Sequence, residues 1–255
     1  MRRCARPLEG QSDDVCDSAG WQGSGIQEKT IMEVLFQAYP ALQEAVDTLC
    51  GGVSWCITGA SVLLYDETNA LYLELTKPKH WQERPDGSTV IGIGGLGGSL
   101  EQGESILTCL ERELQEEIRA AVCLKSAATT YLIYEQQHIE ALALEEAGHP
   151  RPLLLTISKN LYRQHAHPEA EILAIVTFDA RLSGAPRLGD LFGILRIPHP
   201  VLSRAFEPDE IPLDTLIRLP GVEVQTQQPL PPKVLLRPVW TGRSLQLLLQ
   251  ATYRF

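Results

Sequence analysis

The stretch that decides the fold is Gly94-Gly-Leu-Gly-Gly-Ser-Leu-Glu-Gln-Gly-Glu-Ser-Ile-Leu-Thr-Cys-Leu-Glu-Arg-Glu-Leu-Gln-Glu-Glu-Ile-Arg-Ala120. It begins as a glycine-rich loop, and glycine permits positive φ and the close approach of other groups to the backbone. It continues as a helical segment in which the run Arg112 to Glu117 places acids on successive turns. We therefore expect a loop followed by an acidic helix, and this unit is the candidate functional centre.

Three acids of this helix are predicted to share one face. With about 100° per residue, Glu113, Glu116 and Glu117 lie within one third of the circumference. Carboxylates this close repel one another unless a cation neutralises them, and all-oxygen ligands suit Mg²⁺ or Mn²⁺. The helix also carries an apolar stripe made of Ile106, Leu110, Leu114 and Ile118. Glu117 falls inside this stripe, which favours a metal site over an ordinary solvated acidic face.

The same segment resembles the Nudix box. In that motif a Gly is followed after five residues by Glu, and after seven more by Arg-Glu-aliphatic-x-Glu-Glu-x-Gly-aliphatic. The matching positions are Gly98, Glu104, Arg112, Glu113, Leu114, Glu116 and Glu117. At ordinary residue frequencies a chance match in a chain of this length is far rarer than roughly one in ten thousand. Arg119 stands where the family has Gly, and Ala120 fills the last position.

This resemblance implies a hydrolase that cleaves a diphosphate linkage in a nucleoside diphosphate derivative by attack of water on phosphorus. The implied ligands of Mg²⁺ or Mn²⁺ are the Gly98 carbonyl and the carboxylates of Glu113, Glu116 and Glu117. The catalytic candidates are Glu113, Glu116, Arg112 and Glu104. Arg112 is expected to orient a neighbouring Glu through a charge-assisted hydrogen bond, with Glu104 as its partner.

Other candidate residues lie in the loop and downstream of the motif. Gly97 is a candidate for substrate binding, as is Tyr134, whose ring is equally explained by packing in a strand. Glu169 and Glu171 are candidates for an extra metal ligand or base, because family members recruit one from a later loop; exposed loop acids are the equal alternative. The substrate itself, whether nucleotide sugar, dinucleotide or nucleoside triphosphate, is left open.

The motif has three other interpretations. The run Gly92-Ile-Gly94-Gly-Leu-Gly97 matches the dinucleotide-binding pattern Gly-x-Gly-x-x-Gly, but Glu101 and Glu104 obstruct the helix N-terminus that a bare pyrophosphate needs. We therefore reject a dinucleotide site. A catalytically silent Nudix-fold nucleotide-binding or regulatory module is the alternative function, supported by Arg119 in place of Gly. An isomerase on the same fold has no positive support.

Composition limits the partners of the chain. The net charge of −10 argues against nucleic acid, since phosphate backbones require clustered Lys and Arg. A polyphosphate substrate remains compatible if a divalent metal lies between the two. The six cysteines form no Cys-x-x-Cys pair and indicate free thiols in a reducing compartment. With no apolar leader and no run long enough to span a membrane, we expect a cytoplasmic protein, compatible with a homodimer.

The expected fold class is α+β: a Nudix-type α/β/α sandwich with a central mixed sheet and the loop-helix unit. Four segments are predicted: a disordered tail (1–26), a helical extension (27–52), the Nudix core (53–184) and a helical extension packed on the core (185–255). The first extension should split at Pro40 and end at Gly51. Within the core, strands are expected near 53–65, 70–76, 88–93, 121–134, 153–158 and 172–178. Residues 135–148 are predicted to be a short helix or a loop.

Overall fold

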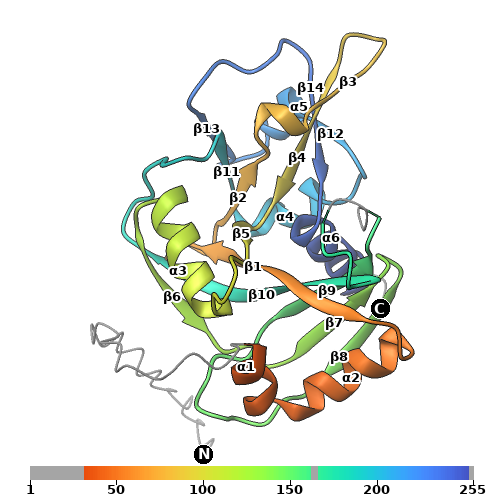
Figure 1. The fold of residues 1–255 in the computed structure, drawn as a ribbon. Coiled ribbons are helices and arrows are strands. Elements are labelled where there is room, and N and C mark those ends of the chain that lie inside the picture. The colour runs from red at the N-terminus through yellow and green to blue at the C-terminus, as the bar shows by residue number, and fades with distance from the viewer. Residues whose placement is uncertain (1–31, 162–165, 253–255) are drawn as a thin grey trace, which may run out of the picture.

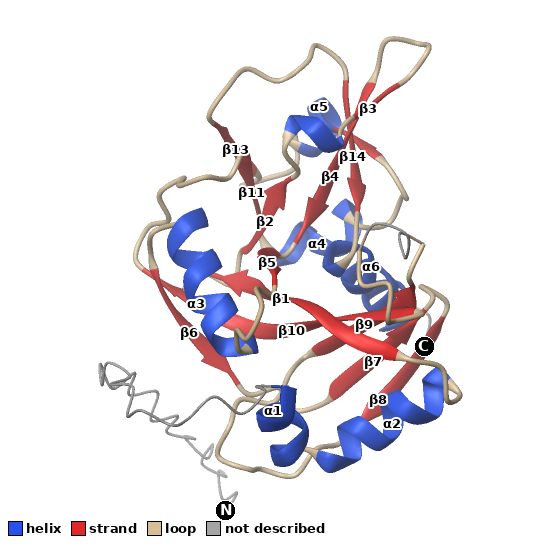
Figure 2. Ribbon diagram, in the orientation of Figure 1, coloured by secondary structure: helices blue, strands red, loops and turns tan. Residues whose placement is uncertain are grey.

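The computed structural model describes residues 32–161 and 166–252, which form a mixed α/β structure with one large mixed sheet and few helices (Figures 1 and 2). The helices are α1 (Met32–Ala38), α2 (Pro40–Cys50), η1 (Pro78–His80), α3 (Ile106–Glu117), α4 (His199–Ala205), α5 (Leu213–Leu216) and α6 (Thr241–Thr252). The strands are β1 (Trp55–Tyr65), β2 (Leu71–Leu75), β3 (Gln82–Glu83), β4 (Thr89–Gly94), β5 (Leu96–Ser99), β6 (Ala121–Lys125), β7 (Thr130–Tyr134), β8 (His138–Leu142), β9 (Leu154–Lys159), β10 (Ile172–Ser183), β11 (Gly193–Ile197), β12 (Ile211–Pro212), β13 (Glu223–Thr226) and β14 (Val234–Pro238).

The sheet is centred on β1. Its strand order is β12-β14-β4-β2-β1-β10-β9-β7-β8, and the pairs β1–β10, β14–β4 and β7–β9 are parallel. One edge of β1 is shared between two partners: residues 59–62 pair with β5, and residues 64–65 pair with β2. This division places the glycine-rich strand β5 directly beside the middle of β1.

Side chains on the two faces of the sheet enter two separate hydrophobic clusters, as the period of two in a strand requires. Val62 and Leu64 belong to the cluster that also contains residues of α1, α2 and α3. Leu63 belongs to the cluster that contains residues of α4, α5 and α6. Helix α3 therefore packs on one face of the sheet, and the C-terminal helices pack on the other.

The N-terminal helices match the sequence prediction over the part of them that the structure describes. Pro40 stands at the first position of α2, where its missing N–H is harmless, and Tyr39 separates α1 from α2. Gly51 then ends α2 in the left-handed conformation, with φ of 63°. The predicted tail, residues 1–26, lies outside the described residues.

The prediction of a helical segment at 185–255 is wrong in its secondary structure. Helices α4, α5 and α6 are present, and the closing helix matches the expected range, but the segment also contains four strands: β11 before α4, and β12, β13 and β14 between α4 and α6. Strand β14 joins the sheet parallel to β4, and β11 pairs with β2. Of the prolines in this segment, Pro198 and Pro208 lie in connections, Pro200 lies in the first turn of α4, and Pro212 ends β12. The C-terminal segment thus completes the central sheet.

Two predictions inside the core are also corrected. The expected strand 121–134 is two strands, because β6 pairs with the end of β10 whereas β7 pairs with β9. Residues 135–148 contain β8, which forms a hairpin with β7. Glu135 and Gln136 form the tight turn with φ of 51° and 54°, a type I′ geometry for which glycine or asparagine is the usual signal. None of the helices described is both long enough and apolar enough to cross a membrane.

Candidate functional site

Strand β5 holds the glycine-rich loop against the sheet. A Cβ at Gly97 would collide with the Ala60 carbonyl oxygen, and φ at Gly97 is 136°, so glycine is required there on both counts. The Gly97 N–H donates to Oε2 of Glu117 over 2.9 Å. The loop backbone therefore fixes the carboxylate of the acid that sequence analysis placed in the apolar stripe.

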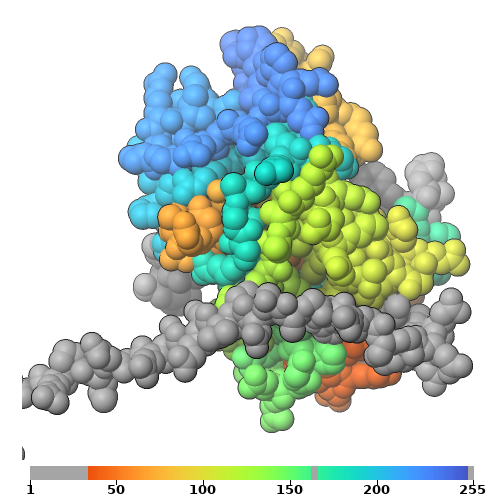
Figure 3. Space-filling view, turned by 90° about the vertical axis from the view of Figure 1, so that its left-hand side faces the viewer, coloured from red at the N-terminus to blue at the C-terminus, as the bar shows by residue number. Residues whose placement is uncertain are grey.

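Helix α3 begins with a side-chain cap. The Ser105 hydroxyl accepts the backbone N–H of Thr108 over 2.8 Å, which satisfies one of the free donors of the first turn. The apolar side of the helix is buried against the sheet, and its outer side is exposed at Thr108, Glu111 and Gln115. Figure 3 shows this outer surface, in yellow-green, on the face of the molecule turned toward the viewer.

Gly98 lies directly beneath the carboxylate of Glu113. A Cβ built at Gly98 would overlap the Glu113 carboxylate oxygens, so only glycine allows this approach. The Gly98 carbonyl accepts a long hydrogen bond from the Cys109 thiol, with a sulfur–oxygen distance of 3.7 Å. The two residues that the Nudix resemblance assigns to one metal are therefore in direct contact.

Gly98→Ala is expected to lower the free energy of unfolding by about 1–3 kcal/mol, because the added methyl group must displace Glu113 or the strand. Gly94→Ala is the matched control: its Cβ would lie 3.6 Å from Oε1 of Glu74, an ordinary contact. Urea unfolding midpoints of both variants measure the difference. Equal stability of the two variants would contradict the close packing of Glu113 on Gly98.

Arg112 links several acids of the motif. Its Nε and Nη2 donate to the two oxygens of Glu104 at 2.8 and 2.9 Å, the bidentate pair expected from the sequence. Its Nη1 donates to Oε1 of Glu113 at 2.8 Å and lies 3.6 Å from Oε2 of Glu116. The Arg112 guanidinium holds the pKa of the Glu104 carboxyl below its usual range. Arg112 therefore positions Glu113 while leaving Glu116 largely in solvent, with 52% of its side chain exposed.

Glu117 is buried and electrostatically strained. It is only 5% exposed, and desolvation, together with the nearby charges of Glu74 and Glu113, raises its pKa to about 9. Desolvation, together with the charges of Glu113 and Asp190, raises the pKa of Glu74 to about 7, against the opposing effect of the Lys77 charge. Two carboxyl groups of raised pKa beside a third acid form an oxygen-rich site in which ionised carboxylates are disfavoured unless a cation is bound. These all-oxygen donors have the chemistry that a hard divalent cation such as Mg²⁺ or Mn²⁺ prefers, although no three of the acids Glu74, Glu113, Glu116 and Glu117 have carboxylate oxygens within 4.8 Å of one another in this arrangement.

Sequence analysis missed Glu74, although a signal for it exists. Leu71, Leu73 and Leu75 of β2 are buried in one cluster, so the intervening Glu74 must point to the opposite face, the side on which α3 packs. Strict alternation in this short strand could therefore have placed an acid under the helix. Two further charges, Lys77 and Asp190, were also missed; they form an ion pair of 2.7 Å and both influence the acids of the site.

A loop far along the chain closes the end of α3. The backbone N–H groups of Arg187, Gly189 and Asp190 donate to the carbonyls of Ile118, Glu117 and Glu116 at 2.8, 2.7 and 2.9 Å. These are carbonyls that a helix end leaves without partners. A Cβ at Gly189 would overlap the Glu116 carbonyl oxygen, so glycine is needed for this approach. The segment 187–190 thus fixes the helix end that carries the acids.

Arg119, the departure from the Nudix pattern, adopts a left-handed backbone conformation that favours glycine. Its φ is 48°, in the left-handed region, and its N–H donates to the Leu114 carbonyl over 3.2 Å. A side chain in this region costs about 1–2 kcal/mol. The chain therefore leaves the helix with an arginine in a conformation that glycine favours, and this lowers the free energy of unfolding.

Arg119→Gly is expected to raise the free energy of unfolding by about 0.5–1 kcal/mol, since the relief of strain exceeds the entropy that glycine adds to the unfolded chain. Arg119→Ala keeps a Cβ at the same φ and is the control, with a change near zero. Denaturant unfolding of the three proteins tests the difference. A glycine variant no more stable than the alanine variant would contradict strain at this position.

Three candidate residues from later in the chain do not lie near the acids Glu113, Glu116 and Glu117. Tyr134 lies on β7, four inter-strand steps from β5, or about 19 Å across the sheet, and packs on the core. Glu171 donates its backbone N–H to Ser54, about six residues or roughly 20 Å along β1 from Ala60, the partner of Gly98. Glu169 instead lies with His167, 3.5 Å from its Nδ1, near the beginning of β1.

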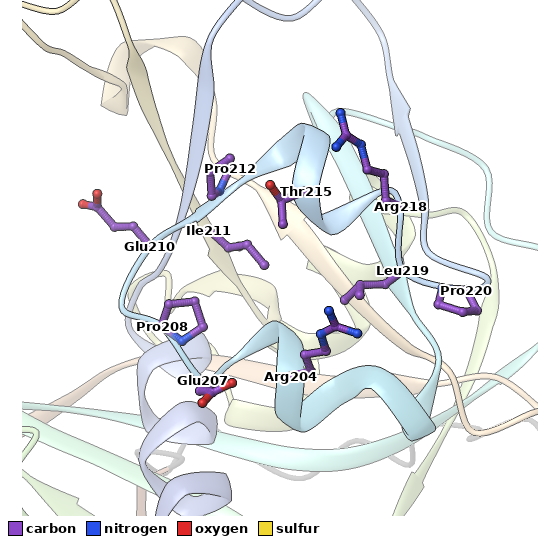
Figure 4. Close-up of a pocket in the computed structure, with 10 residues that line it drawn as sticks. All are labelled: Arg204, Glu207, Pro208, Glu210, Ile211, Pro212, Thr215, Arg218, Leu219 and Pro220. Carbon is purple, nitrogen blue, oxygen red and sulfur yellow. The ribbon is translucent and has the colours of Figure 1, made fainter.

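A separate hollow of about 660 Å³ lies among α4, α5 and their connections (Figure 4). Its lining residues are Arg204, Glu207, Pro208, Glu210, Ile211, Pro212, Thr215, Arg218, Leu219 and Pro220. Glu210 is neutralised by ion pairs with Arg84 and Arg237. None of the motif acids borders this hollow, so we do not assign it a role in their chemistry.

Comparison with known proteins gives little beyond these observations. No family model matches the chain, and no curated protein matches it. Among solved structures, it is similar to the Escherichia coli ORF135 protein, with a TM-score of 0.32 and 13% identity over 60% of this chain and 81% of that one. It is also similar to the E. coli dihydroneopterin triphosphate pyrophosphohydrolase, with a TM-score of 0.33 and 12% identity over 58% and 84%. At these scores the likeness carries no functional argument, and the site has to be interpreted from its own residues.

Proposed function

We propose that this chain is a metal-dependent hydrolase of the Nudix type. It would cleave the diphosphate linkage of a nucleoside diphosphate derivative, such as a nucleotide sugar, a dinucleotide or a nucleoside triphosphate. The observation that carries the proposal is the burial of Glu117 among other acids. Desolvation, together with the charges of Glu74 and Glu113, raises the pKa of Glu117 to about 9. A buried acid among other acids destabilises the fold unless a bound group compensates its charge.

The residues would divide the work as follows. Glu113, Glu116, Glu117 and the Gly98 carbonyl would hold Mg²⁺ or Mn²⁺, which when bound polarises the phosphoryl group. Arg112 fixes the orientation of Glu113, and Gly97 fixes that of Glu117. Glu116, the most exposed of the three helix acids, suits the acceptance of a proton from the attacking water. The water oxygen bonds to phosphorus as the bridging P–O bond breaks, releasing two phosphorylated products.

The alternative of a catalytically silent module loses its main support in this geometry. Its basis was Arg119 in place of glycine, and Arg119 adopts a left-handed φ of 48°, a conformation that glycine favours. The acids of the motif are all present, and the end of the helix is held by the loop 187–190. Nothing in the arrangement of the acids favours loss of catalysis.

The test is hydrolysis of a substrate panel by the purified chain with Mg²⁺. Nucleotide sugars, dinucleotides and nucleoside triphosphates would be incubated with the protein, and the phosphorylated products separated by ion-exchange chromatography. We expect turnover of at least one class, abolished by a chelator and restored by added Mg²⁺. Failure to hydrolyse any member of a broad panel, with Mg²⁺ or Mn²⁺ present, would refute the hydrolase.

A further inference from the structure

A second group of metal-ligating side chains lies away from the motif acids. Cys56, His167 and Glu169 each offer one ligand atom, and the three atoms lie within 4.8 Å of one another; no other such trio of His, Cys, Asp or Glu was found in the described ranges, 32–161 and 166–252. Cys56 is the second residue of β1, and the other two come from the connection between β9 and β10. Cys56 is four residues, or about 13 Å, along β1 from Ala60, which faces Gly98. The trio is therefore separate from the proposed hydrolase site.

The connection that carries His167 and Glu169 is held in place by backbone contacts. The side-chain Nδ2 of Asn160 donates to the backbone carbonyls of Ala166, His167 and Ala170, each at 3.0 Å. The backbone N–H of Ala170 donates to the His167 carbonyl at 3.0 Å. His167 has φ of 50°, a conformation that non-glycine residues keep only where the surrounding structure fixes it. The imidazole and the carboxylate are thus positioned beside Cys56 by the fold itself.

The three groups converge on one point and do not form a line. A Cys-His-acid catalytic triad needs the two imidazole nitrogens to face the thiol and the acid separately, which places thiol and acid on opposite sides of the ring. Here the thiol and the carboxylate approach the same point, and Nδ1 of His167 lies 3.5 Å from Oε1 of Glu169. That separation is near the edge of a tetrahedron built with bonds of about 2.0–2.1 Å.

We propose that Cys56, His167 and Glu169 form a Zn²⁺ site with an open fourth position. A thiolate, an imidazole and a carboxylate match the ligand preferences of Zn²⁺, whereas the all-oxygen set of the motif acids matches Mg²⁺. The half-buried Cys56 supplies the inner ligand, and the exposed sides of His167 and Glu169, at 41% and 67%, leave the fourth position to water or another oxygen donor. This site does not depend on the proposed hydrolase activity.

Co²⁺ is the probe, because a thiolate ligand gives a sulfur-to-cobalt charge-transfer absorption in the near ultraviolet that oxygen ligands do not. The full chain would be stripped of metal, reduced and titrated with Co²⁺. We expect the band to appear with one equivalent, to disappear when Zn²⁺ is added, and to be absent in Cys56→Ser. Cys123→Ser, which removes another half-buried thiol, should keep it. His167→Ala, at an exposed position, should weaken Zn²⁺ binding at least about 100-fold in a chelator competition.

Three results would overturn the site. One is the absence of a charge-transfer band in a folded wild-type protein, with folding checked by circular dichroism. Another is a band that persists in Cys56→Ser, which would assign the thiolate to another cysteine. The third is rapid alkylation of Cys56 at neutral pH that His167→Ala abolishes, which would identify a nucleophile in place of a ligand. None of these measurements uses hydrolysis, so failure of the zinc site and failure of the hydrolase are distinguished.

Discussion

Glu117→Gln is expected to reduce Mg²⁺-dependent hydrolysis by about 10²- to 10³-fold, the usual effect of removing one preorganised charge from an active site. The amide has the shape of the carboxyl group and can still accept the Gly97 N–H, so the local structure should be retained. What it cannot supply is an anionic oxygen for a divalent cation. Turnover of the substrate identified in the panel, measured at saturating Mg²⁺, gives the size of the effect.

The control for this variant lies on the same helix. Glu111 is exposed on the outer side of α3, so Glu111→Gln makes the same change of charge without touching the site. It should retain full turnover. If Glu117→Gln were as active as wild type, or if Glu111→Gln lost as much activity, the proposed role of Glu117 would be wrong. Circular dichroism of both variants establishes that the comparison is between folded proteins.

The parts of the site that lie close together in the sequence could be predicted from it. The helix, the burial of Glu117 and the Arg112–Glu104 pair follow from spacings of at most a few turns, which the period of a helix fixes. Glu74 and Asp190 could not be found in this way. They come from a strand and a loop that reach α3 only through the pairing of the sheet and the capping of the helix end.

The errors in the fold have the same physical origin. The hairpin β7–β8 was missed because Glu135 and Gln136 occupy left-handed positions without the glycine that usually marks them. The strands of the C-terminal segment were missed because β14 pairs with β4, more than a hundred residues earlier in the chain. Local periodicity carries no information on such partners, and proline appears in strand ends as readily as in helix breaks. The alternation within β2 places Glu74 on the face opposite Leu71, Leu73 and Leu75, but it does not identify the helix that covers this face.

Without divalent cations, the free energy of unfolding is expected to fall as the pH rises from about 5 to about 9. The pKa of Glu117 is about 9 in the folded chain against an ordinary value of 4.5, so the folded state binds more protons in this range. The contribution of Glu117 to the free energy of unfolding is therefore fully present below pH 4.5 and is lost as the pH rises through 9. The loss is about 1.4 kcal/mol per pH unit for one such group. Glu74, with a pKa of about 7, adds a loss of the same sign up to about pH 7.

Glu117→Gln removes the larger of these two titrations, so its free energy of unfolding should decline much less between pH 5 and 9 than that of wild type. Urea unfolding in chelator-containing buffers measures both slopes, and Glu111→Gln should keep the wild-type slope. Added Mg²⁺ should restore wild-type stability at pH 8, by about 2.7 kcal/mol at 100 times its Kd, and should have little effect on Glu117→Gln. Identical slopes for wild type and Glu117→Gln would show that the side chain of Glu117 does not keep its proton over this pH range in the folded protein. Binding of the cation would then displace no proton from Glu117.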